Sequence, residues 1–240
     1  MVTVEELEQI ALQSQEGIPQ DDHGNFHSLE KFEDELGVSF VEIIERLKKV
    51  FDCKLIVGNI NGHSGSIAAE FQEYGGVEVF ATGGTFYLSQ ESPIPRNRYI
   101  IADTEDVNSM KKIPDNAFHL LYSCRGLEGN NDPHIAIPEI HRMLVPKGMA
   151  VFDWEFLPDY TPQLERLDTK VLQDLHVFST WTGGYYDIHE FNGYWAGCRH
   201  FIDTFEARIS GKSQDDAQKV FERYPPLGKT GYRFEINKSR

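Results

Sequence analysis

The sequence has few cysteines, a shortage of basic residues and no long apolar run. Its three cysteines, Cys53, Cys124 and Cys198, are widely spaced and form neither a CxxC nor a zinc-binding pattern, which favours a reducing compartment. The apolar runs fall far short of the ~20 residues that a membrane-spanning helix requires. The acidic, amphipathic start MVTVEELEQIALQSQEG lacks the pattern of a secretory signal peptide. We therefore expect a cytoplasmic protein that does not enter a membrane.

Positive charge is scarce, with 23 Lys and Arg against 38 Asp and Glu and a net charge of −15. Because a phosphate-binding surface needs clustered Lys and Arg, we expect neither nucleic acid nor an anionic membrane as the main partner. A local cluster of basic residues near the end of the sequence is interpreted as a solvated tail, and it comprises Lys229, Arg233, Lys238 and Arg240.

A chain of 240 residues with 40% hydrophobic residues can form one domain with a sizeable core. We expect an N-terminal helical extension over residues 1–52 and a nucleotide-binding core over residues 53–156. The remainder, residues 157–240, includes the aromatic-rich segment 175–196, which is predicted to form a cap over a site.

Hydrophobic spacing predicts how helices and strands alternate along the chain. Helical spacing is present over residues 3–14, 29–51, 66–74, 133–144, 162–174 and 213–223. Short apolar runs that predict strands are present over residues 54–57, 77–80, 98–102, 117–123, 149–154 and 231–237. Strand, glycine-rich turn and helix in repetition indicate an α/β fold with a doubly wound, mostly parallel sheet. Pro146 and Gly148 are expected to stop the helix and reverse the chain before the strand at 149–154.

Three motifs lie in order within residues 99–155. They are YIIADTEDV at 99–107, IPDNAFHLLYSCRGLEGNNDP at 113–133 and PEIHRMLVPKGMAVFDWE at 138–155. Together they resemble class I S-adenosylmethionine-dependent methyltransferases of the type 11 kind, and a more diffuse likeness covers residues 50–155. The resemblance implies a Rossmann-like seven-stranded sheet with N-terminal helices, S-adenosylmethionine as cofactor and a small molecule as methyl acceptor.

Ligands of an open parallel sheet bind at the carboxyl ends of the strands. The resemblance places the cofactor-binding residues in the turns there, at Gly58, Asn59, Gly62, Gly65, Thr82, Asp103, Thr104, Ser123, Cys124 and Arg125. It implies that Asp103 accepts a hydrogen bond from the adenine amino group.

Two acidic residues of the family are missing. Ile56 occupies the place of the first acid, and Ala81 or Thr82 occupies the place of the acid that binds the ribose hydroxyls. Hydrogen bonds to a charged group are worth about 1.5–3 kcal/mol each. The loss predicts an affinity weakened by an order of magnitude or more.

Methyl transfer is an in-line displacement that depends mainly on proximity and alignment, so a catalytic motif is not required. The candidates for a catalytic role are His63, Arg125, Asp153, Glu155 and His189. No metal is expected, because there is no HExxH motif and the acidic and histidine residues at 187–190 are too compact for a ligand set.

Other functions stay open. A methyltransferase fold that has lost cofactor binding and acts as a non-catalytic binding or scaffolding subunit would explain the missing acids. The spacing of Gly58 and Gly62 mimics a short-chain dehydrogenase, but the sequence has no Tyr-x-x-x-Lys pair. Cyclase or isomerase chemistry on the same fold, and a homodimer or another protein partner, are further alternatives.

Overall fold

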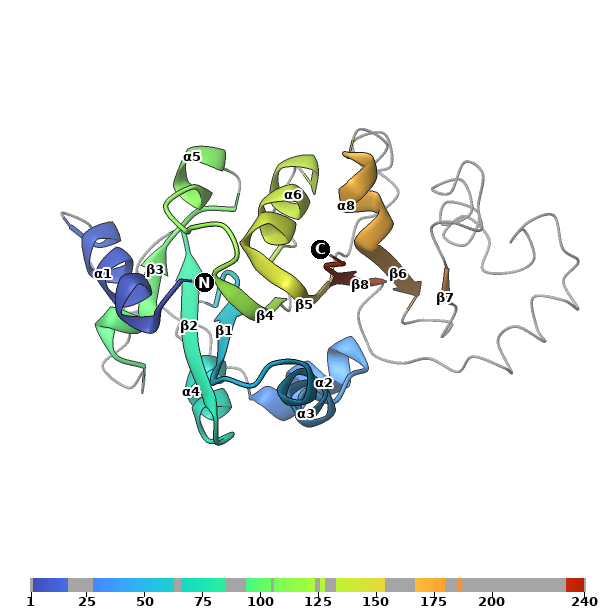
Figure 1. Ribbon diagram of the computed structural model, residues 1–240, viewed down its shortest axis with the longest axis horizontal. Helices are drawn as coiled ribbons and strands as arrows, with labels where there is room; N and C mark the ends of the chain where they lie inside the picture. Colours follow the sequence, from blue (N-terminus) through green and yellow to red (C-terminus); the bar gives the residue numbers. More distant parts are fainter. Residues whose placement is uncertain are drawn as a thin grey trace, which may run out of the picture.

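The computed structural model describes residues 2–16, 28–62, 66–84, 94–104, 106–123, 126–127, 133–153, 167–179, 185–186 and 232–239. One sheet with the strand order β3-β2-β1-β4-β5-β8-β6-β7 forms their centre (Figure 1). The strands are β1 Leu55–Asn59, β2 Val77–Gly83, β3 Tyr99–Ile101, β4 Phe118–Ser123, β5 Leu144–Asp153, β6 Leu175–Ser179, β7 Tyr185–Tyr186 and β8 Tyr232–Asn237.

The strands from β3 to β5 are parallel, whereas β8 runs antiparallel to both β5 and β6. The chain builds the sheet outward from β1 to β3 and then returns to build it in the other direction from β4. This reversal places a topological switch point between β1 and β4. The predicted doubly wound, mostly parallel sheet is confirmed, and in the described part of the chain it has eight strands in place of the expected seven because the two-residue β7 adds one.

Helices cover both faces of the sheet (Figure 1). The helices α2, α3 and α4 lie on one face, and α5, α6 and α8 lie on the other, while α1 lies beside the edge strand β3. Their bounds are α1 Val4–Ser14, α2 Leu29–Leu36, α3 Phe40–Val50, α4 Ser66–Gln72, α5 Val107–Met110, α6 Pro133–Met143 and α8 Thr169–Asp174. No helix in the described ranges is long and apolar enough to cross a membrane.

Two hydrophobic clusters fill the space between the sheet and its helices. One contains Phe118 and Leu121 with α6, and the other contains Val57 and Tyr122 with α3 and α4. The central strands are buried on both faces, which explains why their sequences are continuous apolar runs rather than alternating ones.

The predicted helix over residues 29–51 is two helices. Gly37 ends α2 in the left-handed conformation, with φ 64°, and the Ser39 hydroxyl caps α3 by accepting from the Glu42 amide. Arg233 of β8 donates to the carbonyl oxygens of Leu36 and Gly37 at 2.9 and 2.7 Å. Helical spacing continues through the break, so the apolar pattern alone did not reveal it.

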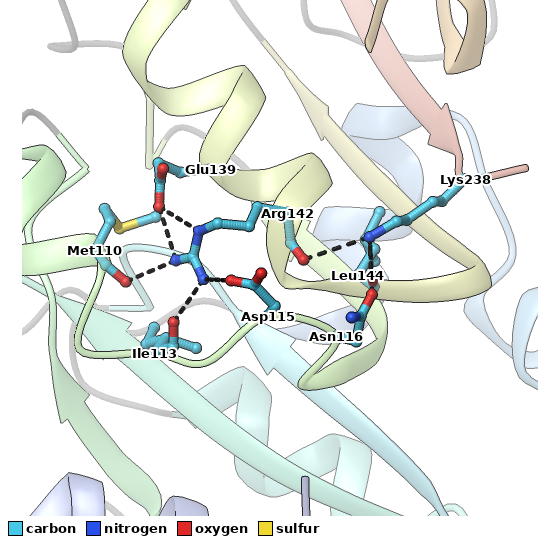
Figure 2. Close-up of polar contacts among 8 residues, drawn as sticks. All are labelled: Met110, Ile113, Asp115, Asn116, Glu139, Arg142, Leu144 and Lys238. Atoms are coloured by element: carbon cyan, nitrogen blue, oxygen red, sulfur yellow. Dashed lines mark hydrogen bonds and ion pairs between the residues drawn. The ribbon is translucent and has the colours of Figure 1, made fainter. Parts of the chain in front are cut away.

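The interpretation of the C-terminal basic residues as a solvated tail is wrong for Arg233 and Lys238, both of which are buried. The Lys238 ammonium donates to the Asn116 side chain at 2.9 Å and to the Leu144 carbonyl at 2.6 Å (Figure 2). These bonds satisfy polar groups where α6 ends and β5 begins. Lys229 and Arg240 lie outside the described residues.

The connection between α6 and β5 also differs from the expectation that Pro146 and Gly148 stop the helix and reverse the chain. The strand β5 begins at Leu144, directly after α6, and Lys147 rather than Gly148 adopts a left-handed conformation, with φ 68°. A Cβ on Gly148 would lie 2.8 Å from the carbonyl oxygen of Val145. Gly148 is therefore required for close packing and not for chain reversal.

Part of the aromatic-rich segment belongs to the sheet and not to a cap. Residues Leu175–Ser179 form β6 and Tyr185–Tyr186 form β7. The rest of that segment, and the helix predicted at 213–223, lie outside the described residues.

Candidate functional site

The turn after β1 is bonded to the strands on both sides of it. The Ile60 amide donates to the Tyr122 carbonyl at 2.8 Å, and the Ser123 hydroxyl donates to the Ile60 carbonyl at 3.0 Å. On the other side, the Gly62 amide donates to the Thr82 carbonyl at 2.8 Å. The carboxyl ends of β1, β2 and β4 therefore meet at the switch point.

Asn61 connects this turn with two others. Its backbone is left-handed, with φ 51°, a conformation that Asn tolerates better than most residues. Its Nδ2 donates to the Thr104 hydroxyl at 3.0 Å and also to the carbonyl oxygen of Gly126. The turns after β1, β3 and β4 are thus held together by one side-chain amide.

Two buried polar side chains end adjacent strands at this place. Asn59 and Thr82 are 1% and 2% exposed, and Asn59 Oδ1 and Thr82 Oγ1 have no hydrogen-bond partner among the residues that the structure describes. Such atoms are rare in native proteins, because an unsatisfied buried group costs about 1–3 kcal/mol. Both oxygens can accept a hydrogen bond, and the Thr82 hydroxyl can also donate one.

Asp103 lies in the turn after β3 and is exposed. Its amide donates to the Ser109 hydroxyl at 2.9 Å, while the next helix, α5, is capped by Asp106, whose carboxylate accepts from the Asn108 amide at 2.9 Å. A Cβ on Gly84 would lie 3.4 Å from the Asp103 carboxyl carbon. Asp103 is therefore not needed as the helix cap, and its carboxylate lies beside the end of β2.

Gly58 lies inside β1 and not in the turn, so the expectation that the strand ends there is wrong. A Cβ at this position would lie 2.5 Å from Leu121 Cδ2 and 3.0 Å from the Phe118 ring. Packing alone accounts for this glycine.

The cofactor-binding role of Gly58, like the roles of the other assigned residues, stays a prediction. Gly65, Cys124 and Arg125 lie outside the described residues.

The places of the two missing acids are buried, and Ile56 and Ala81 there are apolar, whereas Thr82, the alternative to Ala81, is polar. Ile56 and Ala81 are 5% and 0% exposed, and the Ile56 amide donates to His119 Nδ1 at 2.9 Å. Burial lowers the pKa of His119, so the imidazole is neutral at neutral pH with its proton on Nε2, 3.5 Å from Cys53 Sγ. His119 is thus a structural residue near the start of β1.

Among the catalytic candidates, the structure describes Asp153 alone. It is buried at the carboxyl end of β5 and is opposite Arg233 in the antiparallel pair with β8. The candidates His63, Arg125, Glu155 and His189 lie outside the described residues. No group of three metal-ligating side chains gathers within the described ranges, and the expectation of no metal stays a prediction.

Sequence reasoning missed Asn61. The Asn61-Gly62 dipeptide is a recognised turn signal, and it was available in the sequence. The partners of the Asn61 side chain, at positions 104 and 126, come from distant parts of the chain and give no local signal.

No protein-family model matches the sequence, and no curated protein matches it either. Among solved structures, the YcgJ protein from Bacillus is 18% identical with a TM-score of 0.34, over 48% of this chain and 50% of that one. An S-adenosylmethionine-dependent methyltransferase from Mesorhizobium loti is 20% identical with a TM-score of 0.35, over 48% of this chain and 54% of that one. This chain therefore spans about half the length of both proteins. A putative methyltransferase from an antibiotic biosynthesis pathway of Anabaena variabilis is 12% identical with a TM-score of 0.43, over 84% of this chain and 99% of that one.

Proposed function

We propose that this chain binds S-adenosylmethionine at the switch point between β1 and β4 and acts as a methyltransferase on a small molecule. The observation that carries the proposal is a pair of buried atoms at the carboxyl ends of adjacent strands, Asn59 Oδ1 and Thr82 Oγ1, which have no hydrogen-bond partner in the described part of the chain. Ligands of doubly wound sheets bind at that place. A ligand rich in hydroxyl groups would satisfy both atoms.

The polar residues of the site fit a nucleoside. Thr82 is one of the two residues, with Ala81, that fall where the family has an acid, and it would offer the ribose a neutral acceptor in place of a charged one. Neutral hydrogen bonds contribute about 0.5–1.5 kcal/mol each, less than charged ones, so weaker binding follows. Asp103 keeps the carboxylate that would accept from the adenine amino group. The bound cofactor would supply an activated methyl group, and the chain would orient the acceptor beside it.

A second function has its own support. Ile56 and Ala81 are buried among apolar side chains, and the turns after β1 and β4 are in close contact. Both features agree with a fold that no longer binds a cofactor and serves as a non-catalytic binding or scaffolding subunit. Titration calorimetry with S-adenosylmethionine and S-adenosylhomocysteine separates the two functions, and no heat at about 1 mM ligand excludes the first.

The variant Thr82→Val makes the calorimetry specific to the site. Val has the same shape and lacks only the unpartnered oxygen, so the folded state should be as stable as the wild type or more stable. The ligand loses one neutral hydrogen bond, and its Kd should rise about two- to tenfold. Loss of affinity without loss of stability is the signature of a residue that serves the ligand.

Tyr122→Phe is the matched control. The Tyr122 hydroxyl is also buried without a partner among the described residues, but its ring packs against Phe32, Phe40 and Phe71 under the helices. Removal of the Tyr122 hydroxyl should raise the stability in the same way as Thr82→Val and leave the Kd for the nucleoside ligands unchanged. An equal Kd for Thr82→Val and the wild type would exclude Thr82 from the binding site.

A further inference from the structure

We infer that Asn61 is a latch that closes the crevice at the switch point, and that a nucleoside-type ligand displaces it on entry. The inference rests on the proposed function for the nature of the ligand. By latch we mean the side-chain amide of Asn61 with its two acceptors, Thr104 Oγ1 and the carbonyl oxygen of Gly126.

The latch spans the place where a ligand would lie. An amide nitrogen has two protons, and both acceptors of Asn61 Nδ2 belong to turns other than its own. Thr104 follows β3, Gly126 follows β4, and Asn61 follows β1, so the amide crosses the carboxyl ends of the sheet. The crevice of a doubly wound sheet lies between the turns after β1 and β4.

Gly126 allows the turn after β4 to pack closely against the turn after β1. A Cβ at this position would lie 2.5 Å from the Ser123 hydroxyl and 2.8 Å from the carbonyl oxygen of Ile60. The turn after β4 therefore lies directly against the turn after β1, and the Ser123 hydroxyl donates to Ile60 across the same contact at 3.0 Å. These contacts hold the described parts of the two turns against each other at Ile60 and Gly126.

The closed state is incomplete in its hydrogen bonding. With the latch in place, Asn59 Oδ1 and Thr82 Oγ1 have no partner among the described residues. Opening breaks the two bonds of Asn61, whereas an entering ligand with hydroxyl groups supplies donors for the two unpartnered atoms. The new bonds offset those of Asn61, so the latch weakens the binding of the ligand without excluding it.

The variant Asn61→Gly removes the latch and keeps the backbone, because glycine adopts the left-handed conformation without strain. When the open state is a minor one, the apparent Kd equals the intrinsic Kd divided by its population. Loss of two neutral hydrogen bonds should therefore lower the Kd for S-adenosylhomocysteine about fivefold or more. Asn61→Asp keeps the side-chain volume but turns a carboxylate toward the Gly126 carbonyl, so it should act in the same direction.

Asn116→Gly is the matched control. Asn116 also has a left-handed backbone, with φ 56°, and its side chain accepts from Lys238 Nζ at 2.9 Å. It precedes β4, at the opposite end of the strand from Ser123. The same chemical change there should leave the Kd unchanged.

The experiment measures the Kd for S-adenosylhomocysteine by calorimetry and the hydrogen exchange of the Ile60 and Gly62 amides in all variants. We expect tighter binding and faster exchange of both amides in Asn61→Gly, with neither change in Asn116→Gly. Equal or weaker binding by Asn61→Gly, with the wild type binding, overturns the latch. If no variant binds S-adenosylhomocysteine, the proposed function fails and hydrogen exchange alone tests the latch. Unchanged protection of Ile60 and Gly62 in Asn61→Gly then overturns the latch as well.

Discussion

Removal of the Arg142 side chain should destabilise the protein strongly, because its guanidinium joins α6 to the end of α5 and to the segment that follows it (Figure 2). It donates to the carbonyl oxygens of Met110 and Ile113 at 3.0 and 2.8 Å. It also contacts the carboxylates of Glu139 and Asp115, each at 2.7 Å. Burial acts to lower the pKa of Arg142, but the bonds and charges of the two carboxylates outweigh it, so the net pKa is raised and the group stays charged.

The magnitude follows from what Arg142→Ala leaves behind. The Asp115 side chain is 70% exposed and returns to water, so its share is at most about 1 kcal/mol. The Glu139 side chain is 11% exposed and keeps a poorly hydrated charge. The two carbonyl oxygens each lose a bond from a charged donor, worth about 1.5–3 kcal/mol. We expect a total loss of about 3–5 kcal/mol in the free energy of unfolding.

Urea unfolding followed by circular dichroism measures this loss. Arg142→Lys keeps the charge but cannot donate in several directions at once, so it should lose about half as much. Asp115→Asn, the control at the exposed end of the network, should lose less than about 1 kcal/mol. A loss below about 1 kcal/mol for Arg142→Ala would refute the reasoning, because it would mean that water replaces every one of these contacts.

Three further predictions concern other buried groups. Burial lowers the pKa of His119 in the folded state. Below about pH 6.5 the unfolded chain therefore takes up a proton that the folded chain does not. The free energy of unfolding falls as the pH drops from there toward the pKa of the folded state. His119→Asn, whose side-chain oxygen can still accept from the Ile56 amide, should show a smaller fall in Tm than the wild type between about pH 7 and 5. If the difference in Tm between the variant and the wild type stays the same across that range, the prediction is wrong. Gly58→Ala should lose about 1–3 kcal/mol in urea unfolding, because its methyl group would approach Leu121 Cδ2 at 2.5 Å, and wild-type stability would disprove the packing explanation. Lys238→Met keeps the apolar stem but leaves carbonyl oxygens at the end of α6 without their donor, so it should lose about 1.5–3 kcal/mol, and a loss smaller than that of Asp115→Asn would contradict the assignment.

The order of the central strands could be predicted because these strands are buried on both faces and punctuated by glycine and proline. The run 117–123 matches β4, Phe118–Ser123, within one residue. The end of β2 could not be predicted, since its last residues pair with a distant strand, Ala81 with Tyr99 and Gly83 with Ile101. Small side chains there predict a turn locally, and only the pairing makes them a strand.

For the candidate site, the sequence indicated which strand ends meet, but not the contacts between them. Asn59, Thr82 and Ser123 follow from the rule that the carboxyl ends of parallel strands meet. The role of Asn61 depends on which turns meet in the folded chain, and no local pattern contains that information. Gly58 shows a related limit, because the neighbouring Leu121 side chain requires a glycine there whether or not a ligand does.

The insertion of β8 between β5 and β6 has a consequence for synthesis of the chain. Val151 of β5 pairs with Glu235, and Val177 of β6 pairs with Phe234, so both strands need β8 as a neighbour. The ribosome must add residues 154–231 before the first residue of β8 appears. During that interval β5 has an open edge, which is a template for pairing with other nascent chains. Chaperones that bind exposed strands should therefore engage the nascent chain until β8 has been added, and chains truncated before Tyr232 should aggregate.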